Sequence, residues 1–325
     1  MESVLVTGGT GFIGSHLVDA LITKQYKVYC AVRNFNKLKW LQGKSVEFIK
    51  YDLYSSDIVL PHVDYVYHLA GLTKAKKNKD FYKVNYEGTV KLINAIKKQK
   101  KPMKGFFLLS TLAVNGDMNA GKIAVEDPIS PESHYAKSKW MAEQEVLKYK
   151  DSMNIVIIRP TVVYGPRDKE LFSYFKLVKK SRLAPIFNKN GTYSFLYITD
   201  LINMLLLLIE KSQSLESGQI FLMSDGRGYK WRDIIDNISF LMSIKVRQIV
   251  IPQFVAYLIA IIITLLNYLK REPFILTIDK LKEIFKKCWF CDIKEVRKIL
   301  NFDPEYDLNR GLQLTFEWYK TNGWL

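Results

Sequence analysis

The chain has 325 residues, 48% of them hydrophobic, with 17 glycines and 10 prolines. These proportions exclude a disordered or linker-rich protein and allow one large domain or two coupled domains. Lysine and arginine number 48 against 32 aspartates and glutamates, which gives a formal net charge of +16. The excess suggests phosphates or an acidic membrane face as partners, although we assign most of it to a solvated surface. We do not expect nucleic acid as a partner, because no nucleic-acid-binding motif accompanies the charge.

The first residues and the cysteines bear on the compartment. The N-terminal "MESVLV" enters a β-like run without a signal-peptide pattern, so we expect a cytoplasmic protein. Cys30, Cys288 and Cys291 fit a reducing compartment. The "CWFC" stretch has CxxC spacing but no second ligand pair and no βαβ context, so we expect two free thiols and no metal site.

Residues 7–16, "TGGTGFIGSH", follow the β-rich run "SVLV" and lead into a run with helical apolar spacing. The stretch is typical of a strand, a glycine turn and a helix, where a dinucleotide pyrophosphate binds. We expect Gly8 to permit the tight turn, Gly11 to let the backbone approach the phosphates and Gly14 to let the helix pack on the strand. The amides of Phe12 and Ile13 at the helix start would face the anion. A structural turn without a ligand is the alternative.

Apolar β-like runs alternate with helical patterns through the first half of the chain. The expected strands cover 27–32, 46–51, 64–70, 105–110 and 154–160, and the expected helices include 82–99 and 134–149. This alternation predicts an α/β fold with a Rossmann-type doubly wound parallel sheet. After residue 165 the pattern loosens into short strands, "SFLYI" and "QIFLM", among helices. We therefore expect a dinucleotide-binding domain over 1–165, to which the chain partly crosses back later, and a smaller, mainly substrate-binding domain over 166–325.

Tyr135 and Lys139 in "SHYAKSKW" lie four residues apart on a predicted helix and therefore share one face. A lysine ammonium near a phenol favours the phenolate and lowers the tyrosine pKa from about 10 toward neutral pH. Tyr135 can then exchange a proton with a substrate hydroxyl or carbonyl while a nicotinamide gives or takes hydride. An isolated pair of this kind is usually surface decoration, but this pair follows a nucleotide-binding loop and the expected strands.

With these motifs the sequence resembles the extended short-chain dehydrogenase/reductase family. That group includes sugar-nucleotide epimerases and dehydratases, dihydroflavonol reductases and 3β-hydroxysteroid dehydrogenases. The resemblance covers essentially the whole chain, and its motifs are specific in combination. They are "TGGTGFIG", "YDL" at 51–53, "HLAG" at 68–71, "VNYEGT" at 84–89, "LLST" at 108–111, "YAKSK" at 135–139 and "RPTVVYGP" at 159–166.

The resemblance implies a set of positions around the cofactor and the reacting atoms. They are Asp52 and Leu53 beside the adenine, Ala70 and Gly71 beside the ribose, Asn85 bracing the active site, Pro160 and Val162 near the nicotinamide, and Thr111 or Ser110 bonded to the reacting oxygen. Counting back from Gly116, the glycine of the family's "(S/T)xxxYG" run, places Thr111 at the catalytic position and keeps Ser110 as the reserve. Lys139 is also implied to contact the nicotinamide ribose.

The end of the second strand, "VYCAVRNFNK", bears on the choice of cofactor. An acid there binds the ribose 2′-hydroxyl of NAD, whereas an arginine suits the 2′-phosphate of NADP by charge and geometry. Arg33 holds this position and no acid does. We therefore prefer NADP to NAD, with stacking of Arg33 on the adenine as the alternative role.

Departures from the family patterns bear on the substrate. Dehydratases resemble "TDExYG" in the catalytic loop, but this chain has Leu112 and Ala113 there, so dehydration is not expected. Epimerases often carry an arginine where "TYSFLYITD" offers Tyr193. We favour an NAD(P)-linked oxidoreductase acting on a secondary alcohol or ketone of a fairly apolar molecule. A nucleotide-sugar epimerase and a non-catalytic NAD(P)-binding protein are the alternatives, and a homodimer is possible in each case. Thr199 or Asp200 is expected to cap a helix.

Residues 254–271, "FVAYLIAIIITLLNYLKR", are nearly free of polar groups. The apolar helix they predict spans about 24 Å, short of the roughly 30 Å hydrocarbon core of a membrane, so we do not expect a transmembrane pass. A wholly buried helix is favoured by a small margin over a helix that rests in a membrane and admits a lipophilic substrate. In the second case the cytoplasmic protein would be membrane-associated. Trp318 and Tyr319 in the last helix are expected to pack rather than bind.

Overall fold

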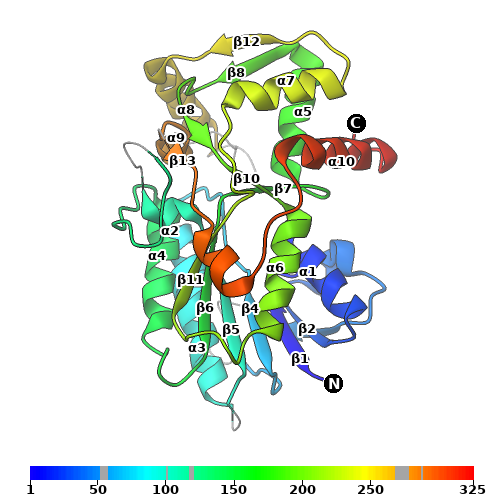
Figure 1. Cartoon of the computed structure of the whole chain (residues 1–325), viewed down its shortest axis with the longest axis vertical. Coiled ribbons are helices and arrows are strands. Elements are labelled where there is room, and N and C mark those ends of the chain that lie inside the picture. The colour runs from blue at the N-terminus through cyan, green and yellow to red at the C-terminus, as the bar shows by residue number, and fades with distance from the viewer. Residues whose placement is uncertain (52–57, 100–101, 117–120, 268–277, 287) are drawn as a thin grey trace. The chain divides into compact units, whose positions relative to one another are not determined.

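A computed structural model describes residues 1–51, 58–99, 102–116, 121–267, 278–286 and 288–325, without the side chains of 264–267 (Figure 1). The chain forms two compact units. The first unit comprises residues 1–111, 134–159 and 202–221, and the second unit comprises 112–133, 160–201 and 222–325.

The central sheet has seven strands in the order β11-β6-β5-β4-β1-β2-β3. The strands are β1 (Ser3–Thr7), β2 (Lys27–Val32), β3 (Glu47–Lys50), β4 (Tyr65–His68), β5 (Gly105–Leu109), β6 (Ile155–Pro160) and β11 (Gln219–Met223). Neighbours from β3 to β6 pair in parallel. Backbone bonds from Gly218 N to Ile155 O and from Thr161 N to Met223 O run in the same sense along β6 and β11, so this pair is parallel as well. The predicted doubly wound parallel fold is confirmed.

The strand order reverses between β1 and β4, so the carboxyl ends of these two strands flank the crevice where such sheets bind ligands. The strands form because both faces of the sheet are covered, which favours unbroken apolar runs. Val4, Leu5 and Val6 of β1 are fully buried, as are Phe106 and Leu108 of β5.

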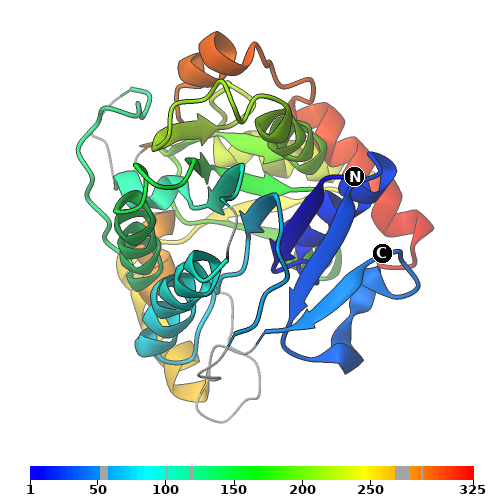
Figure 2. The same ribbon diagram turned by 90° about the horizontal axis from the view of Figure 1, so that it is seen from below.

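The helices of the first unit include α1, α3 and α4, and the latter two pack together (Figures 1 and 2). The elements are α1 (Phe12–Thr23), α2 (Asn78–Phe81), a π-helical turn (Tyr82–Glu87), α3 (Gly88–Lys97), α4 (His134–Leu147) and 3₁₀ turns at Phe35–Lys37 and Lys39–Leu41. The predicted helix 82–99 is thus a π turn followed by an α-helix. Such turns are frequent at functional sites because they redirect side chains.

The second unit holds short strands and helices. Its elements are β7 (Val162–Tyr164), β8 (Leu183–Ile186), β9 (Thr192–Tyr193), β10 (Phe195–Tyr197), β12 (Arg247–Val250), β13 (Cys288–Trp289), α5 (Lys169–Ser181), α7 (Trp231–Leu241), α8 (Gln253–Asn267), α9 (Ile278–Ile284), α10 (Leu308–Thr321), a 3₁₀ turn (Leu112–Asn115) and a π turn (Val296–Leu300). β10 pairs with β7, β12 with β8 and β13 with β9, all in parallel. Tyr319 of α10 is fully buried and donates to Asp168 O at 2.8 Å, so it packs as expected.

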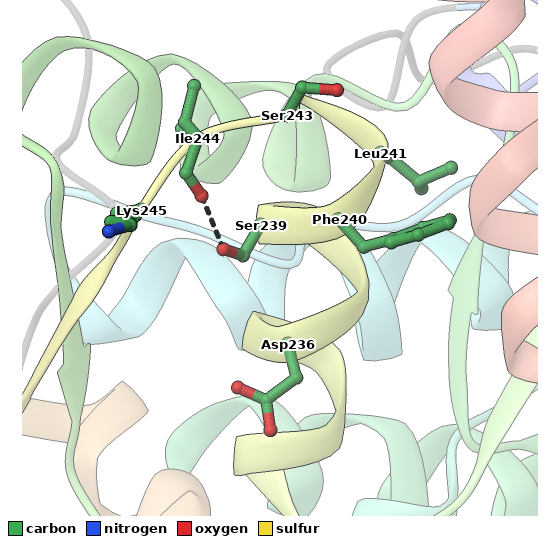
Figure 3. A pocket seen from close by; sticks show the side chains of 7 residues that line it. All are labelled: Asp236, Ser239, Phe240, Leu241, Ser243, Ile244 and Lys245. Atoms are coloured by element: carbon green, nitrogen blue, oxygen red, sulfur yellow. Dashed lines mark hydrogen bonds between the residues drawn. The ribbon is translucent and has the colours of Figure 1, made fainter.

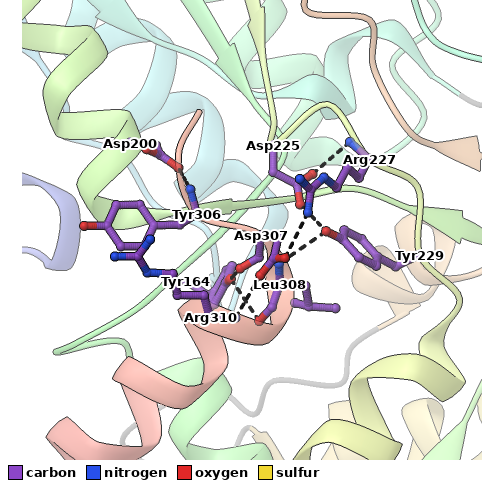
Figure 4. Close-up of polar contacts among 9 residues, drawn as sticks. All are labelled: Tyr164, Asp200, Asp225, Arg227, Tyr229, Tyr306, Asp307, Leu308 and Arg310. Carbon is purple, nitrogen blue, oxygen red and sulfur yellow. Dashed lines mark hydrogen bonds and ion pairs between the residues drawn. The ribbon is translucent and has the colours of Figure 1, made fainter. Parts of the chain in front are cut away.

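α6 (Ile198–Glu210) begins before Thr199, so the prediction that Thr199 or Asp200 caps it is wrong. The buried Asp200 carboxylate instead accepts the backbone N–H groups of Glu305 and Tyr306, at 3.0 and 3.1 Å. Figure 4 shows the contact with Tyr306. Burial raises the pKa of Asp200. The side chain therefore holds the segment before α10.

A second polar cluster in Figure 4 holds the same segment. The Tyr229 hydroxyl donates to Asp225 Oδ2 at 2.6 Å and accepts from Leu308 N at 3.2 Å. Arg227 forms an ion pair with Asp307 at 2.9 Å. Burial raises the pKa of Asp225 to about 6. These contacts link the loop after β11 to the start of α10.

The three cysteines are free and buried, so the prediction of two free thiols at Cys288 and Cys291 is confirmed. Cys288 Sγ donates to Gly121 O at 2.7 Å, and burial raises the pKa of Cys291 to about 12. Both thiols are therefore packed inside the second unit, and the Cys291 thiol is not ionised at neutral pH.

The prediction that residues 254–271 form a wholly buried helix is wrong. Phe254, Leu258 and Ile262 of α8 are 69%, 56% and 58% exposed, whereas Ala256 and Ala260 on the opposite face are fully buried. The run is apolar all round, so its periodicity does not reveal which side is covered. Within the described ranges, no helix has the length and apolarity needed to cross a membrane.

Candidate active site

The turn after β1 has no room for a Cβ at Gly8 and Gly14 and little room for one at Gly11. Gly8 has φ +73°, and a Cβ there would lie 2.8 Å from Ala70 N. At Gly14 a Cβ would lie 2.3 Å from Gly8 O and 2.8 Å from Gly9 Cα. Gly14 thus lets α1 pack on the turn itself, whereas the sequence predicted packing on the strand. At Gly11 a Cβ would lie 3.1 Å from Gly8 O.

The start of α1 is built to receive an anion. Gly11 is its N-cap residue and supplies no side chain, and the first turn contains no acidic residue. The N–H groups of the first helical turn, at Phe12, Ile13 and Gly14, have no partner within a helix, and they carry the positive end of its dipole. A bound phosphate would accept these groups, and nothing on α1 competes for them.

Lys139 and Tyr135 lie one helical turn apart near the start of α4. Lys139 is buried and its Nζ donates to Leu109 O at 2.5 Å, which fixes the ammonium at the end of β5. Burial lowers the pKa of Lys139 to about 8, against the opposing effect of Glu143. Tyr135 is half-buried, and its ring lies 6.1 Å from that of Phe81, centroid to centroid.

Ser110 and Thr111 follow β5 directly and are both buried. Ser110 N donates to Ile158 O at 2.7 Å, which continues the ladder between β5 and β6. Ser110 Oγ has no hydrogen-bond partner among the described residues. The pair therefore lies beside the carbonyl that holds Lys139.

A directional hydrogen-bond chain crosses the carboxyl ends of β1 and β4. Thr89 Oγ1 donates to Asn85 O at 2.7 Å, so it accepts from His68 Nε2, which lies 2.9 Å away. His68 Nδ1 then accepts from Thr7 Oγ1 at 2.7 Å, and Thr7 Oγ1 accepts from Ala70 N at 3.2 Å. Burial, with a smaller effect of Lys139, lowers the pKa of His68 to about 3. The imidazole is therefore neutral and has one fixed tautomer.

Asn85 continues this chain to α4. Its Nδ2 donates to Leu72 O at 3.1 Å and to Ser138 Oγ at 2.9 Å, while its Oδ1 accepts from Leu72 N at 2.7 Å. Ser138 Oγ in turn donates to Tyr135 O at 2.7 Å. Asn85 therefore braces the backbone of Tyr135, which is consistent with the bracing role that the resemblance implied.

A buried ion pair also fixes α4 against β6. Arg159 Nε and Nη2 donate to the two carboxylate oxygens of Glu143 at 3.0 and 2.6 Å. Both side chains are almost completely inaccessible. A bidentate pair of this kind sets the rotation and register of a helix against a strand, because removing one partner leaves an unpaired buried charge.

A model described as the NAD dependent epimerase/dehydratase family matches residues 4–224. The chain belongs to this family. The resemblance to extended short-chain dehydrogenases/reductases is thereby confirmed, and so is the prediction of an enzyme of the oxidoreductase or epimerase type. The family does not distinguish NAD from NADP.

Individual relatives extend this result. Ceramide reductase of Caulobacter vibrioides is 26% identical over 99% of this chain and 96% of its own length. Sterol-4-alpha-carboxylate 3-dehydrogenase, decarboxylating, of Candida albicans is 26% identical over 98% of this chain and 97% of its own. UDP-glucose 4-epimerase of Vibrio cholerae is 31% identical over 77% of this chain and 79% of its own. The crystal structure of UDP-glucuronic acid 4-epimerase from Bacillus cereus in complex with NAD, 23% identical, aligns over 98% of this chain and 99% of that chain with a TM-score of 0.80, which shows the shared fold.

The residues present fit the dinucleotide of this family. Gly8 and Gly14 leave a space that a Cβ would fill. The backbone amides of the first turn of α1 are available to a phosphate, because no acidic residue lies in that turn. The crevice between β1 and β4 lies at the same edge of the sheet. The turn from Gly8 to Gly14 would hold the pyrophosphate of a bound dinucleotide.

The other predicted cofactor residues are spread over both units. Arg33 is exposed and directly follows β2, next to β1 in the sheet. A Cβ at Gly71 would lie 3.1 Å from Asn85 Oδ1, so this position is closely packed beside the site. Asp52 and Leu53 lie outside the described residues. Pro160 ends β6, and Val162 begins β7 and is 43% exposed.

Four residues of the site received no role from the sequence, namely His68, Thr89, Ser138 and Glu143. The first three lie inside the motifs "HLAG", "VNYEGT" and "YAKSK", so the motifs marked the positions but not the bonds between them. The signal for Glu143 is a carboxylate on the buried face of α4, four residues after Lys139.

A separate surface hollow contains none of these residues. It opens at the end of α7 and is lined by Asp236, Ser239, Phe240, Leu241, Ser243, Ile244 and Lys245 (Figure 3). Ser239 Oγ donates to Ile244 O at 2.5 Å, which closes the turn after α7. The hollow has no buried polar group aimed into it among these residues, and we assign it no role.

Proposed function

We propose that this member of the family is an NADP-linked oxidoreductase that interconverts a secondary alcohol and a ketone on a lipid-like substrate. The observation that carries the proposal is the burial of Lys139 against Leu109 O, one turn from Tyr135 and beside Ser110 and Thr111. This places a cation, a phenol and hydroxyl donors around one edge of the sheet. They are the groups that proton transfer to a carbonyl oxygen requires.

In the direction of reduction, the Tyr135 hydroxyl gives its proton to the substrate carbonyl oxygen as that oxygen gains electron density. The Lys139 ammonium stabilises the phenolate that remains. Thr111 donates a hydrogen bond to the same oxygen and so stabilises its developing charge. When bound, the reduced nicotinamide supplies the hydride that the carbonyl carbon accepts. The reverse direction uses the same groups, with Tyr135 taking the proton of the alcohol.

Three features support a lipid-like substrate. Leu112 and Ala113, at the positions where dehydratases carry an Asp-Glu pair, are buried apolar residues of a 3₁₀ turn. The relatives named for ceramide and for a sterol carboxylate match nearly their whole length, whereas the Vibrio cholerae epimerase matches over 79% of its own. Tyr193, at the position where epimerases often hold an arginine, donates to Ile284 O at 3.2 Å and is 7% exposed. No phosphate-binding cation therefore replaces that arginine at this position.

The preference for NADP rests on Arg33. An exposed guanidinium at the end of β2 pairs with a 2′-phosphate, and no carboxylate occupies this position to bind a 2′-hydroxyl.

The experiment is a substrate panel followed by the absorbance of the reduced nicotinamide. Long-chain 3-ketones and sterol ketones are offered with NADPH and with NADH, and UDP-glucose and UDP-glucuronic acid are offered in parallel with sugar products resolved by chromatography. Cofactor oxidation with lipid ketones alone supports the proposal. Epimerisation of a UDP-sugar would contradict the proposal and support the alternative function of a nucleotide-sugar epimerase, which the relative at 31% identity also suggests. Cofactor binding without any turnover would favour a non-catalytic binding protein.

A further inference from the structure

Five apolar side chains are exposed along one face of α8. Phe254, Leu258, Ile261 and Ile262 are 69%, 56%, 44% and 58% exposed, and Ile259 is 38% exposed. At 100° per residue these five positions fall within about half of the helix circumference, so they form one continuous stripe. We call this stripe the α8 face. Residues 253–267 contain no aspartate, glutamate, lysine or arginine.

The opposite side of α8 is already used for packing. Ala256 and Ala260 are fully buried and form a small core with Leu281 of α9. The Tyr257 ring stacks on that of Phe285 with centroids 6.2 Å apart. Because the two alanines let α9 approach closely, α8 is anchored in the second unit by one side and presents the α8 face outward.

The strand that leads into α8 extends this surface. β12 ends at Val250, which is 51% exposed, and pairs with β8, whose first residue, Leu183, is 40% exposed. At the other end of β12, Arg247 N donates to Arg182 O at 2.9 Å, so two exposed arginines lie side by side. Figure 1 shows β12 running from the end of α7 to the start of α8.

The sequence around these two strands carries positive charge only. Residues 176–186 and 240–263 contain no aspartate or glutamate. Their basic residues are Lys176, Lys179, Lys180, Arg182, Lys245 and Arg247. Asp236 of α7 contacts this region, because its Oδ1 accepts a hydrogen bond from Gln248 Nε2 at 2.8 Å. Arg232 Nε lies 3.6 Å from Asp236 Oδ2, so the arginine offsets the negative charge of Asp236.

We infer that the α8 face and its basic neighbours dock the protein on a membrane that contains anionic lipids. The apolar side chains enter the boundary between headgroups and acyl chains, and the arginines and lysines pair with the headgroups. Charge decides between this occupant and a second copy of the chain. Two copies joined at this face would bring like charges together, whereas anionic headgroups complement them. Docking is independent of the reaction at Tyr135 and is measured without turnover.

The test is flotation of the full chain with vesicles of phosphatidylcholine alone and of phosphatidylcholine with 30% phosphatidylglycerol. We expect binding to the anionic vesicles that weakens as salt rises from about 50 to 500 mM, because screening acts on the headgroup pairing. Leu258→Asp with Ile262→Asp should lower the bound fraction at least about tenfold, since two charges then enter the bilayer. Val59→Asp, at an 81% exposed apolar position of the first unit, is the control for an acidic substitution away from α8 and should bind like the wild type.

A second pair of double variants tests the contribution of charge. Lys245→Glu/Arg247→Glu changes two basic residues beside the α8 face, and Lys24→Glu/Lys150→Glu is its control. All four positions are exposed, and the two double variants change the net charge equally. Only the Lys245→Glu/Arg247→Glu variant should abolish the preference for anionic vesicles. Circular dichroism verifies that each variant is folded, and sedimentation velocity gives its oligomeric state. Failure of the wild type to float with anionic vesicles at low salt would overturn the inference. Unchanged binding by a folded Leu258→Asp/Ile262→Asp variant would also overturn it. A third contrary result would be a wild-type protein that binds no vesicles and is a dimer, with this variant a monomer.

Discussion

Lys139 Nζ donates a hydrogen bond of 2.5 Å to Leu109 O, and this contact joins the start of α4 to the end of β5. The same carbonyl belongs to the residue before Ser110, so the ammonium and the two hydroxyls lie on adjacent elements of the first unit. Burial makes the contact sensitive to pH, because it lowers the pKa of Lys139 to about 8. The predictions below separate the roles of these groups.

Tyr135→Phe should lower kcat with a lipid ketone by at least about a hundredfold, because it removes the proton donor. Affinity for NADPH should stay within about twofold, since the ring and its contact with Phe81 remain. Steady-state kinetics and fluorescence titration of the cofactor measure the two effects. Full turnover by the phenylalanine variant would contradict the role of Tyr135.

Thr111→Ala and Ser110→Ala distinguish the two hydroxyls. Loss of a hydrogen bond to a charged oxygen costs about 1.5 to 3 kcal/mol, so Thr111→Ala should lower kcat/KM roughly 10- to 150-fold. Ser110→Ala should leave both the activity and the melting temperature nearly unchanged, because Ser110 Oγ has no partner among the described residues. The reverse pattern would assign the catalytic hydroxyl to Ser110.

Lys139→Met should abolish turnover and also change the pH dependence of stability in the cofactor-free protein. A pKa of about 8 in the folded state against 10.5 in the unfolded state means that the unfolded chain binds more protons between these values. The unfolding equilibrium constant of the wild type should therefore fall as the pH rises from 8 to 10.5, by up to about tenfold per unit from this group. Urea titrations at pH 8, 9 and 10 should show a shallower dependence in the methionine variant. Parallel curves for the two proteins would argue against a lowered pKa.

His68→Gln should reduce the sensitivity of the fold to acid. The folded pKa of about 3 lies below the ordinary value of 6.5, so the unfolded chain binds a proton that the folded protein does not accept between these values. Stability from this group is complete above pH 6.5 and is lost as the pH falls toward 3. Glutamine offers a donor and an acceptor to Thr7 and Thr89 but does not titrate. Urea midpoints from pH 7 to 4 should therefore fall less steeply in this variant, and an unchanged slope would count against a neutral His68.

Arg33→Asp should reverse the order of cofactor affinities. The wild type should bind NADPH at least about tenfold more tightly than NADH, since one charge-assisted hydrogen bond is worth about 1.5 to 3 kcal/mol. The aspartate repels the 2′-phosphate and accepts the 2′-hydroxyl instead. Fluorescence titration with both nucleotides gives the two affinities, and equal values in the wild type would refute the assignment of Arg33.

The sheet and the glycine turn could be predicted because local sequence determines them. The strand expected at 27–32 coincides with β2, since a strand buried on both faces reads as an unbroken apolar run. The glycines at 8 and 14 mark backbone that admits no Cβ, which is a constraint visible in the sequence.

The remaining features depend on partners distant in the chain. Asp200 matches a local capping pattern, yet its carboxylate binds backbone more than a hundred residues away. The sequence of α8 could not show which of its sides is buried, because the run is apolar throughout. Ala256 is buried and Leu258 is exposed, although both residue types are compatible with a core. The chain from Thr7 through His68 to Thr89 joins three motifs whose contact appears only after β1 and β4 pair.

The most direct test of the proposed function follows deuterium from cofactor to product. NADPH deuterated at the transferable position of the nicotinamide is incubated with a long-chain ketone and the wild type or Tyr135→Phe, and the alcohol is analysed by mass spectrometry. We predict one deuterium on the carbinol carbon with the wild type, and at least about a hundredfold less product in the same time with the variant. The proposed function would be contradicted if no lipid ketone received deuterium while a UDP-sugar was epimerised without net oxidation of the cofactor.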